Sequence, residues 1–532
     1  MTSPLSRSRS RRVPSHIAVR VAHAVLGGLV AMGWLVLPLA RAGADAPVAR
    51  ARDTGVAARP VTTAQDGTTT GDLVPPLVAV GAAGALAAYG YGRRRRRATT
   101  RTTPGGDPEV TPLHELDAQA RRLLVETDDC VRVGAEELAL AEDRSAGDAI
   151  EPYVYDLRHA EAGLAAAFRL RQRLDETEAA GVDPAQDESE RREVLEEIVA
   201  HCREAGERLD AAAPGLDQIR ALERNAVAAL ESAEARFREG AARIRGAEAT
   251  LAELHERYAP AASLPVAGDA EQAKDRLLFT TSHLNQARQY ADRGDGAKAA
   301  AHLRAAEGAL GQAFDLANGV ERLAAELDSA AAGLPAAITA AEASWNAARA
   351  LPAEARAGLV GRLGHAEAVL SAVRHETAAG PHDPLDALRR VTEAMAGLAG
   401  TGPAGTGGGD VPDGHGQALL PARSALAGAA CFIGTHRGAV GSEARTRLAE
   451  ARRLLGPGSV PLSEVLKADD LAREARRLAE RDVRAYGNPS GGRGGAGAGG
   501  AVLGGILLSD GEGGPMSYGG PRTRGRRGAF FT

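Results

Sequence analysis

The chain has 532 residues with 64 basic and 69 acidic side chains, and this near balance gives no nucleic-acid signature. Aromatic residues make up only 3% of the sequence, fewer than the core of a compact mixed α/β domain normally uses. Alanine, leucine, arginine and glutamate dominate, which is typical of long helices, and three widely spaced cysteines argue against a disulfide framework.

Residues 1–42 have the parts of a secretory signal peptide: a basic start, an apolar stretch and a small-residue ending. The ending Ala-Arg-Ala predicts cleavage after Ala42, with Ala40 as the second small residue of the site. An uncleaved membrane helix is the alternative, because the apolar stretch is long. Residues 43–72 contain almost no large apolar side chain and are predicted to be an extracytoplasmic linker.

Residues 73–92 predict a transmembrane helix, because about 20 mostly apolar residues span the hydrocarbon core of a bilayer. The basic linker 93–110 follows, and it opens with Arg93, Arg94, Arg95, Arg96 and Arg97. Each arginine costs about 2.5–3.5 kcal/mol to place in a membrane, so these five residues are expected to stay cytoplasmic and determine the topology. We expect a single-pass protein of the cell membrane with its helical region in the cytoplasm. Small residues in the span leave a homodimer through helices open.

Apolar residues recur with a helical period throughout region 111–399. The first helix starts near Thr111 and has a predicted buried stripe of Leu113, Leu116, Ala120, Leu124, Thr127, Val131, Ala135 and Leu138. The clearest helix is predicted from Leu216 to Tyr258, where an apolar spacing of about 3.5 favours coiled-coil packing. The prediction is an all-α fold of elongated, antiparallel, spectrin-like bundles behind one transmembrane helix.

The C-terminal part divides into a glycine-rich linker (400–416), further helices (417–485) and a glycine-rich tail (486–532) that is predicted to be disordered. Within the tail, Gly495, Gly497 and Gly500 match the spacing of a dinucleotide-binding loop. No strand precedes them and no helix follows, so the match is attributed to composition.

No metalloprotease, phosphate-loop, nucleophile-elbow or zinc-ligand spacing occurs in the sequence. His201 and Cys202 are adjacent, but they have no second ligand pair nearby. The pairs Asp128-Asp129 and Glu136-Glu137 are interpreted as a solvated helix face, because adjacent residues point to different sides of a helix. We therefore predict no catalytic, cofactor-binding or metal-binding residue and no cofactor.

Several long stretches resemble, in their amino-acid sequence, the cytoplasmic region of actinobacterial TPM-domain membrane proteins. They include "TPLHELDAQARRLLVETDDCVR", "RYAPAASLPVAGDAEQAKDRL", "HRGAVGSEARTRLAEARRLL" and the glycine-rich "RDVRAYGNPSGGRGGAGAGGAVLGGILL". The resemblance covers nearly everything from Leu73 to about Leu508. It implies a membrane helix, an arginine run and a cytoplasmic helical region.

The same resemblance implies an extracytoplasmic TPM module linked to phosphatase activity, yet only residues 43–72 stand at that position. No catalytic or metal-binding residue of the family can be assigned here. We therefore expect a non-enzymatic, membrane-anchored scaffold or interaction protein whose protein partners are unknown and which does not bind nucleic acid. An accessory partner of a complete TPM phosphatase and a structural protein of the envelope or of division are the two alternatives.

Overall fold

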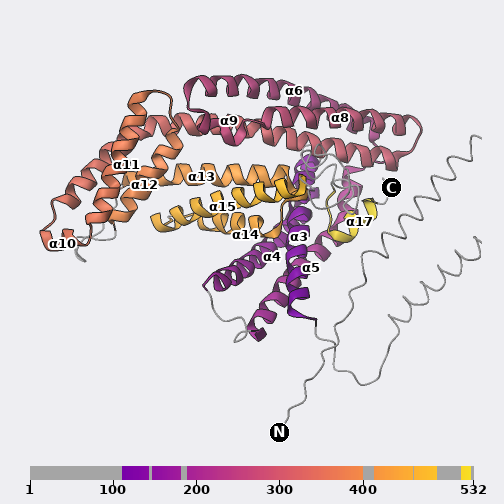
Figure 1. The fold of residues 1–532 in the computed structure, drawn as a ribbon. Helices are drawn as coiled ribbons and strands as arrows, with labels where there is room; N and C mark the ends of the chain where they lie inside the picture. The colour runs from indigo at the N-terminus through magenta and orange to yellow at the C-terminus, as the bar shows by residue number, and fades with distance from the viewer. Residues whose placement is uncertain are drawn as a thin grey trace, which may run out of the picture. The chain divides into compact units, whose positions relative to one another are not determined.

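The computed structural model describes residues 111–142, 147–180, 188–399, 412–458, 460–487 and 517–528. Every element within these ranges is a helix, with no strand among them (Figure 1). The predicted all-α fold is therefore confirmed. The predicted signal peptide, extracytoplasmic linker and transmembrane helix lie outside the described residues.

The first three helices are α3 (Leu113–Glu142), α4 (Gly147–Ala179) and α5 (Glu188–Arg220), and they share one apolar core. Of the predicted stripe on α3, six residues are buried: Leu116, Ala120, Leu124, Thr127, Val131 and Leu138. Ala135 is exposed instead, whereas Val133, Gly134 and Glu137 are buried. A second face of α3 is covered as well, because helices far along the chain also pack against it.

The next group contains α6 (Ala226–Arg257), α8 (Asp269–Asp292) and the 54-residue α9 (Gly296–Arg349), which lie side by side (Figure 1). The predicted continuous helix from Leu216 to Tyr258 is wrong, because the chain breaks at Ala221, whose φ is +46°. Pro214 lies inside α5 and does not begin a helix. The apolar period did not reveal the break because it indicates only which residues face the core. Most of the apolar residues are buried both before and after the turn at Ala221.

Local signals form the hairpin between α8 and α9. Gly294 adopts a φ of +76°, and the backbone N–H of Asp295 donates to the carbonyl of Tyr290 at 2.9 Å. The Asp295 side chain then caps α9 by accepting from the N–H of Lys298 at 3.2 Å. Alanines such as Ala299 and Ala306, both fully buried, allow the two helices to approach closely.

The remaining elements follow in short steps. They are α7 (Pro260–Ser263), η2 (Leu264–Val266), α10 (Ala353–Ala357), α11 (Val360–Ala379), α12 (Pro384–Ala399), α13 (Pro412–Thr435), η3 (Arg437–Ala439), α14 (Ser442–Leu454) and α15 (Leu462–Gly487). Helix α13 begins inside the predicted 400–416 linker and packs along α9, while α14 packs on α4. The predicted separate C-terminal helices therefore belong to the same unit as the preceding ones.

One described helix is long and apolar enough to cross a membrane: α13 over Gly416–Thr435, with a mean hydropathy of 1.3. This is weak evidence for a span, because core helices of soluble proteins have the same length and composition. Residues of α13 such as Ala422, Ala429 and Ile433 are fully buried against neighbouring helices.

The predicted disorder of the tail is wrong for its last described part. Helix α15 continues to Gly487, and a further helix, α17, runs from Pro521 to Gly528. Tyr518, just before α17, is 1% exposed and belongs to the core of α3, α4 and α5. Glycine-rich composition predicts disorder only where no apolar or charged residue finds a partner, and Tyr518 finds one.

Candidate functional site: a charged cavity between α3, α6 and α9

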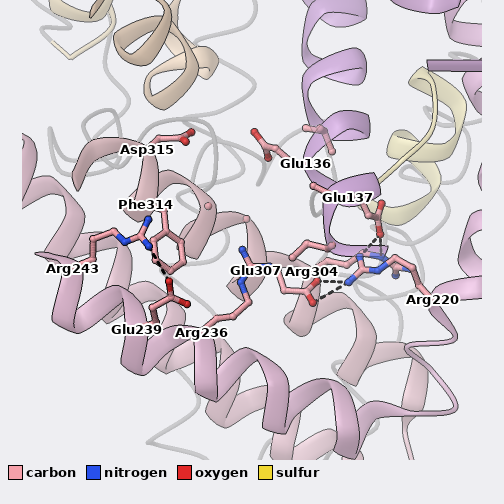
Figure 2. A pocket seen from close by; sticks show the side chains of 15 residues that line it. Glu136, Glu137, Arg220, Arg236, Glu239, Arg243, Arg304, Glu307, Phe314 and Asp315 are labelled. Carbon is pink, nitrogen blue, oxygen red and sulfur yellow. Dashed lines mark hydrogen bonds and ion pairs between the residues drawn. The ribbon is translucent and has the colours of Figure 1, made fainter. Parts of the chain in front are cut away.

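A cavity of about 460 Å³ lies between α3, α6 and α9, at the C-terminal end of α5 (Figure 2). Its lining consists of Val133, Glu136, Glu137, Ala139, Leu140, Arg220, Arg236, Glu239, Arg243, Arg304, Glu307, Gly308, Gly311, Phe314 and Asp315. The volume is in the range of ligand sites, but such sites are mostly apolar. Here arginines and carboxylates provide most of the side chains.

At the buried end, five charged residues form one network. The Arg220 guanidinium donates to Glu137 Oε1 at 2.5 Å and to Glu307 Oε2 at 2.7 Å. Arg304 donates to the same Glu137 oxygen at 3.2 Å and to Asp217 Oδ1 at 2.8 Å. The network joins α3, α5 and α9 through side chains that are at most 8% exposed, apart from that of Asp217.

Burial alone lowers the pKa of Arg220, since it disfavours the charged guanidinium. The carboxylates of Glu307 and Glu137 more than reverse this effect, so the pKa of Arg220 is raised. The Arg220 guanidinium is therefore charged at neutral pH in the folded protein. Removing one member would leave an uncompensated buried charge, which is far more costly than losing a surface pair.

The open end of the cavity combines an aromatic ring with two arginines of α6. The guanidinium carbons of Arg243 and Arg236 lie 5.0 and 5.8 Å from the centre of the Phe314 ring, within cation–π range. Arg243 also pairs with Glu239 at 2.9 Å, whereas Arg236 has no ion-pair partner among the described residues and extends into the cavity (Figure 2). Arg236 is thus the one lining arginine without such a partner in the described chain.

Asp315 lies opposite, close to Glu136 (Figure 2). Asp315 as a whole residue is exposed, but protein atoms surround its carboxyl group and desolvate it. This desolvation, together with a smaller contribution from the negative charge of Glu136, raises the pKa of Asp315 to about 6. Arg132 and Arg437 act in the opposite direction. The Asp315 carboxyl group can therefore exchange a proton closer to neutral pH than an ordinary aspartate does. The described lining provides no hydroxyl, thiol, imidazole or amine group for covalent catalysis.

The predicted solvated face of α3 is wrong for three of its four acidic residues. Glu137 belongs to the buried network, and Asp128 and Asp129 accept from Arg445 of α14 at 2.5 and 2.7 Å. Burial raises the pKa of Asp129, but Arg445 and further arginines lower it more, so the net shift is downward. A helical wheel shows which residues share a face, and it does not show that a distant arginine covers that face.

The His201–Cys202 pair forms no ligand site. Cys202 is 1% exposed, and burial raises the pKa of its thiol to about 11. His201 points elsewhere, with its ring 3.7 Å from Glu197 on the same helix. Cys130, Cys202 and Cys431 are all free thiols, as their spacing predicted.

A second cavity of about 340 Å³ lies among η2, α9, α13 and α15. The Arg476 guanidinium stacks 4.0 Å above the centre of the Phe432 ring in its wall. Burial raises the pKa of Asp269 to about 6 and that of Cys431 to about 12, so the thiol is protonated and unreactive at neutral pH.

Three carboxylates, those of Glu393, Asp469 and Asp470, come close enough to hold a metal ion. Arg389 and Arg473 already pair with Asp469 Oδ2 at 2.8 and 2.9 Å. The two arginines offset two of the three carboxylate charges, so the group has the character of an ion-pair network between α12 and α15.

The sequence-predicted functional residues, Ala40, Ala42 and Arg93 to Arg97, lie outside the described residues, as do Gly495, Gly497 and Gly500. Sequence reasoning missed Arg220, Arg304 and Glu307. The sequence does indicate Arg304 and Glu307, because they are charged residues within the stretch "AAAHLRAAEGAL", which consists mostly of small and apolar residues. Charged residues on such a face need partners when it is buried.

Two UPF0603 proteins of Mycobacterium tuberculosis, from strains CDC 1551 / Oshkosh and ATCC 25618 / H37Rv, are each 32% identical to this chain over 437 residues. The match covers 77% of this chain and 65% of each relative, so the chain spans just under two thirds of their length. No family model matches the chain, and no solved structure matches it. The chain is therefore similar to actinobacterial proteins, while the TPM assignment has no support from these comparisons.

Proposed function

We propose that this protein is a non-enzymatic, membrane-anchored scaffold whose helical region binds protein partners in the cytoplasm. One observation carries the proposal: the buried charges around the cavity pair with one another. The Glu137 carboxylate, for example, accepts hydrogen bonds from Arg220, from Arg304 and from the backbone N–H of Tyr518. Groups held in this way position helices, whereas a catalytic acid or base must be free to exchange its proton with a substrate.

The finer family assignment is part of the proposal. On this hypothesis the chain is a relative of TPM-domain membrane proteins in which residues 43–72 replace the extracytoplasmic module. The quoted sequence stretches support it, together with the similarity to mycobacterial proteins.

Co-purification tests the scaffold function. The tagged full chain is extracted from actinobacterial membranes at native abundance, cross-linked, and its partners are identified by mass spectrometry. Reproducible cross-links from the exposed sides of α6 to α15 to one protein class support a scaffold. Recovery of a TPM phosphatase identifies the accessory role, and recovery of division proteins identifies the structural role. A chain that shows no specific cross-link contradicts all three.

A second measurement tests the absence of catalysis. The purified full chain is expected to hydrolyse no generic phosphoester in the presence of magnesium, calcium or manganese. Asp315→Asn is the matched variant, because Asp315 is the cavity carboxyl with a pKa near neutrality. Metal-dependent turnover that this substitution abolishes would refute the proposal.

The membrane topology is tested with a reporter that is active only outside the cytoplasm, fused after Pro108. The parent chain is expected to be silent. Replacing Arg93 to Arg97 with serine removes the positive charge that holds the segment's end inside, so signal should appear. High signal from the parent would mean that the orientation is reversed.

A further inference from the structure

The C-terminal segment Ser517–Gly528 packs against a surface of α3, α4 and α5 that is called the groove below (Figure 1 draws α17 beside α5). Tyr518 fills the groove, and its ring meets Tyr153 of α4 edge to face with 6.3 Å between centres. The Tyr518 hydroxyl donates to the Tyr153 carbonyl at 3.1 Å. Its backbone N–H donates to Glu137, the residue at the centre of the charged cavity. Tyr518 thus satisfies its own polar atoms while burying its ring.

Two glycines allow the segment and α5 to touch backbone to backbone. A methyl group on Gly520 would lie 2.0 Å from the carbonyl oxygen of Gly206, which no real contact allows. A methyl group on Gly206 would in turn lie 2.9 Å from Cδ of Pro521. Glycine inside a helix costs about 1 kcal/mol relative to alanine, so Gly206 weakens α5 while it admits the segment. Gly519 adopts a φ of +141°, which favours glycine there too.

Acidic residues of the groove lie next to the N-terminal residues of α17. The Asp210 carboxylate accepts from the backbone N–H groups of Arg522 at 3.2 Å and Thr523 at 2.8 Å, and so caps α17 from a different helix. Arg524 places its guanidinium 3.6 Å from Cys130 Sγ. Burial lowers the pKa of Arg524, but Cys130, Asp129 and Glu126 outweigh this and raise it. Charge complementarity therefore adds to the fit of the backbone.

We propose that this groove is a peptide-binding site that recognises Tyr-Gly-Gly-Pro followed by a basic helical turn, and that its ligand is the Ser517–Gly528 segment of the same chain. The contacts lie within eight consecutive residues, Ser517 to Arg524, so a short peptide contains the determinants of recognition. The site goes beyond the scaffold function proposed above, although both proposals use the contact between Tyr518 and Glu137.

The test uses the chain ended after residue 516 and a fluorescent peptide of residues 517–528. Saturable binding by fluorescence anisotropy is expected, and it should weaken as salt rises from 50 to 500 mM because charges contribute. The Gly520→Ala peptide should bind at least about tenfold more weakly, which corresponds to about 1.4 kcal/mol. Equal binding of the two peptides would overturn the proposal, as would no binding by a shortened chain that keeps its helical circular dichroism.

The groove side has its own variant and a matched control. Gly206→Ala should weaken peptide binding at least about tenfold while it leaves or raises thermal stability, because alanine favours the helix. Gly361→Ala, on α11 with open space around it, should leave binding unchanged. A loss of binding in both variants would contradict a specific site.

The unshortened chain tests whether the segment binds in cis. Its groove is occupied, so it should bind added peptide at least about tenfold more weakly than the shortened chain. If the shortened chain fails to fold, the full chain with Gly520→Ala replaces it as the receptor with a vacated groove. Full chains that dimerise only while residues 517–532 are present would show docking onto a second copy, and that outcome overturns the cis assignment.

Discussion

The α8–α9 seam and the α3–α14 seam are held together by different forces. In the first, small residues such as Ala287, Ala299 and Ala306 pack two helices that are joined by a short turn. In the second, Arg445 of α14 reaches Asp128 and Asp129, more than 300 positions earlier in the chain. The first seam depends on close packing spread over many small contacts, and the second depends on a few buried charges. The comparison teaches that one helical protein can join local neighbours by shape and distant ones by charge.

The largest expected effect comes from Arg445→Met in the α3–α14 seam. The substitution keeps much of the volume but leaves two carboxylates without their buried cation, which should cost about 3–5 kcal/mol of unfolding free energy. Urea unfolding measures it. The control is Arg481→Met, because the Arg481 and Glu443 side chains are 56% and 47% exposed and their ion pair should contribute at most about 1 kcal/mol. Equal losses in the two variants would mean that burial of the charge does not matter.

The α8–α9 seam should respond to volume instead. Ala306 is fully buried, so Ala306→Leu forces side chains into a closely packed space and should cost about 1–3 kcal/mol. Ala306→Gly tests the other direction and should cost about 1 kcal/mol, mainly through helix propensity. Urea unfolding again measures both changes. If Ala306→Leu were tolerated without loss, this seam would not be closely packed.

Acid should weaken the α8–α9 seam through a histidine pair. His283 and His302 face each other with 3.0 Å between their Nδ1 atoms. Burial, and then the neighbouring His302, lower the pKa of His283 to about 4. The unfolded state therefore binds more protons between about pH 6.5 and 4, so stability falls as the pH falls through this window. We expect a loss of about 1–2 kcal/mol between pH 7.5 and 5.

His283→Asn should flatten this pH dependence, and urea midpoints at several pH values measure it. The control is His365→Asn on the exposed surface of α11, which should keep the slope of the parent. An unchanged slope in His283→Asn would mean that the pair does not resist protonation.

The smallest effect is expected at the turn of the same hairpin. Asp295→Ala removes the side-chain cap of α9, and the melting temperature should fall by about 1–2 °C. Asp295→Asn keeps an acceptor and should retain most of the stability. A fall as large as that of Arg445→Met would show that the hairpin turn, and not its packing, holds α8 against α9.

The helical class and many of the buried positions could be predicted from the sequence alone. Leu116, Leu124 and Leu138 of α3 follow from the helical period, and the end of α6 at Arg257 follows from the proline at position 260. Period, caps and prolines act within a few residues, so they can be evaluated without knowledge of the rest of the chain.

Which charges are buried, and where residues 517–528 lie, depend on tertiary contacts that local patterns do not contain. Asp129 and Glu137 look like solvated residues until Arg445 and Arg220 cover them, and Tyr518 belongs to a glycine-rich stretch until α3, α4 and α5 enclose it. The free energy of a buried charge or ring depends on the partner it meets, and these partners come from distant parts of the chain. A local sequence pattern therefore cannot predict which charged or aromatic residues are buried by such distant partners.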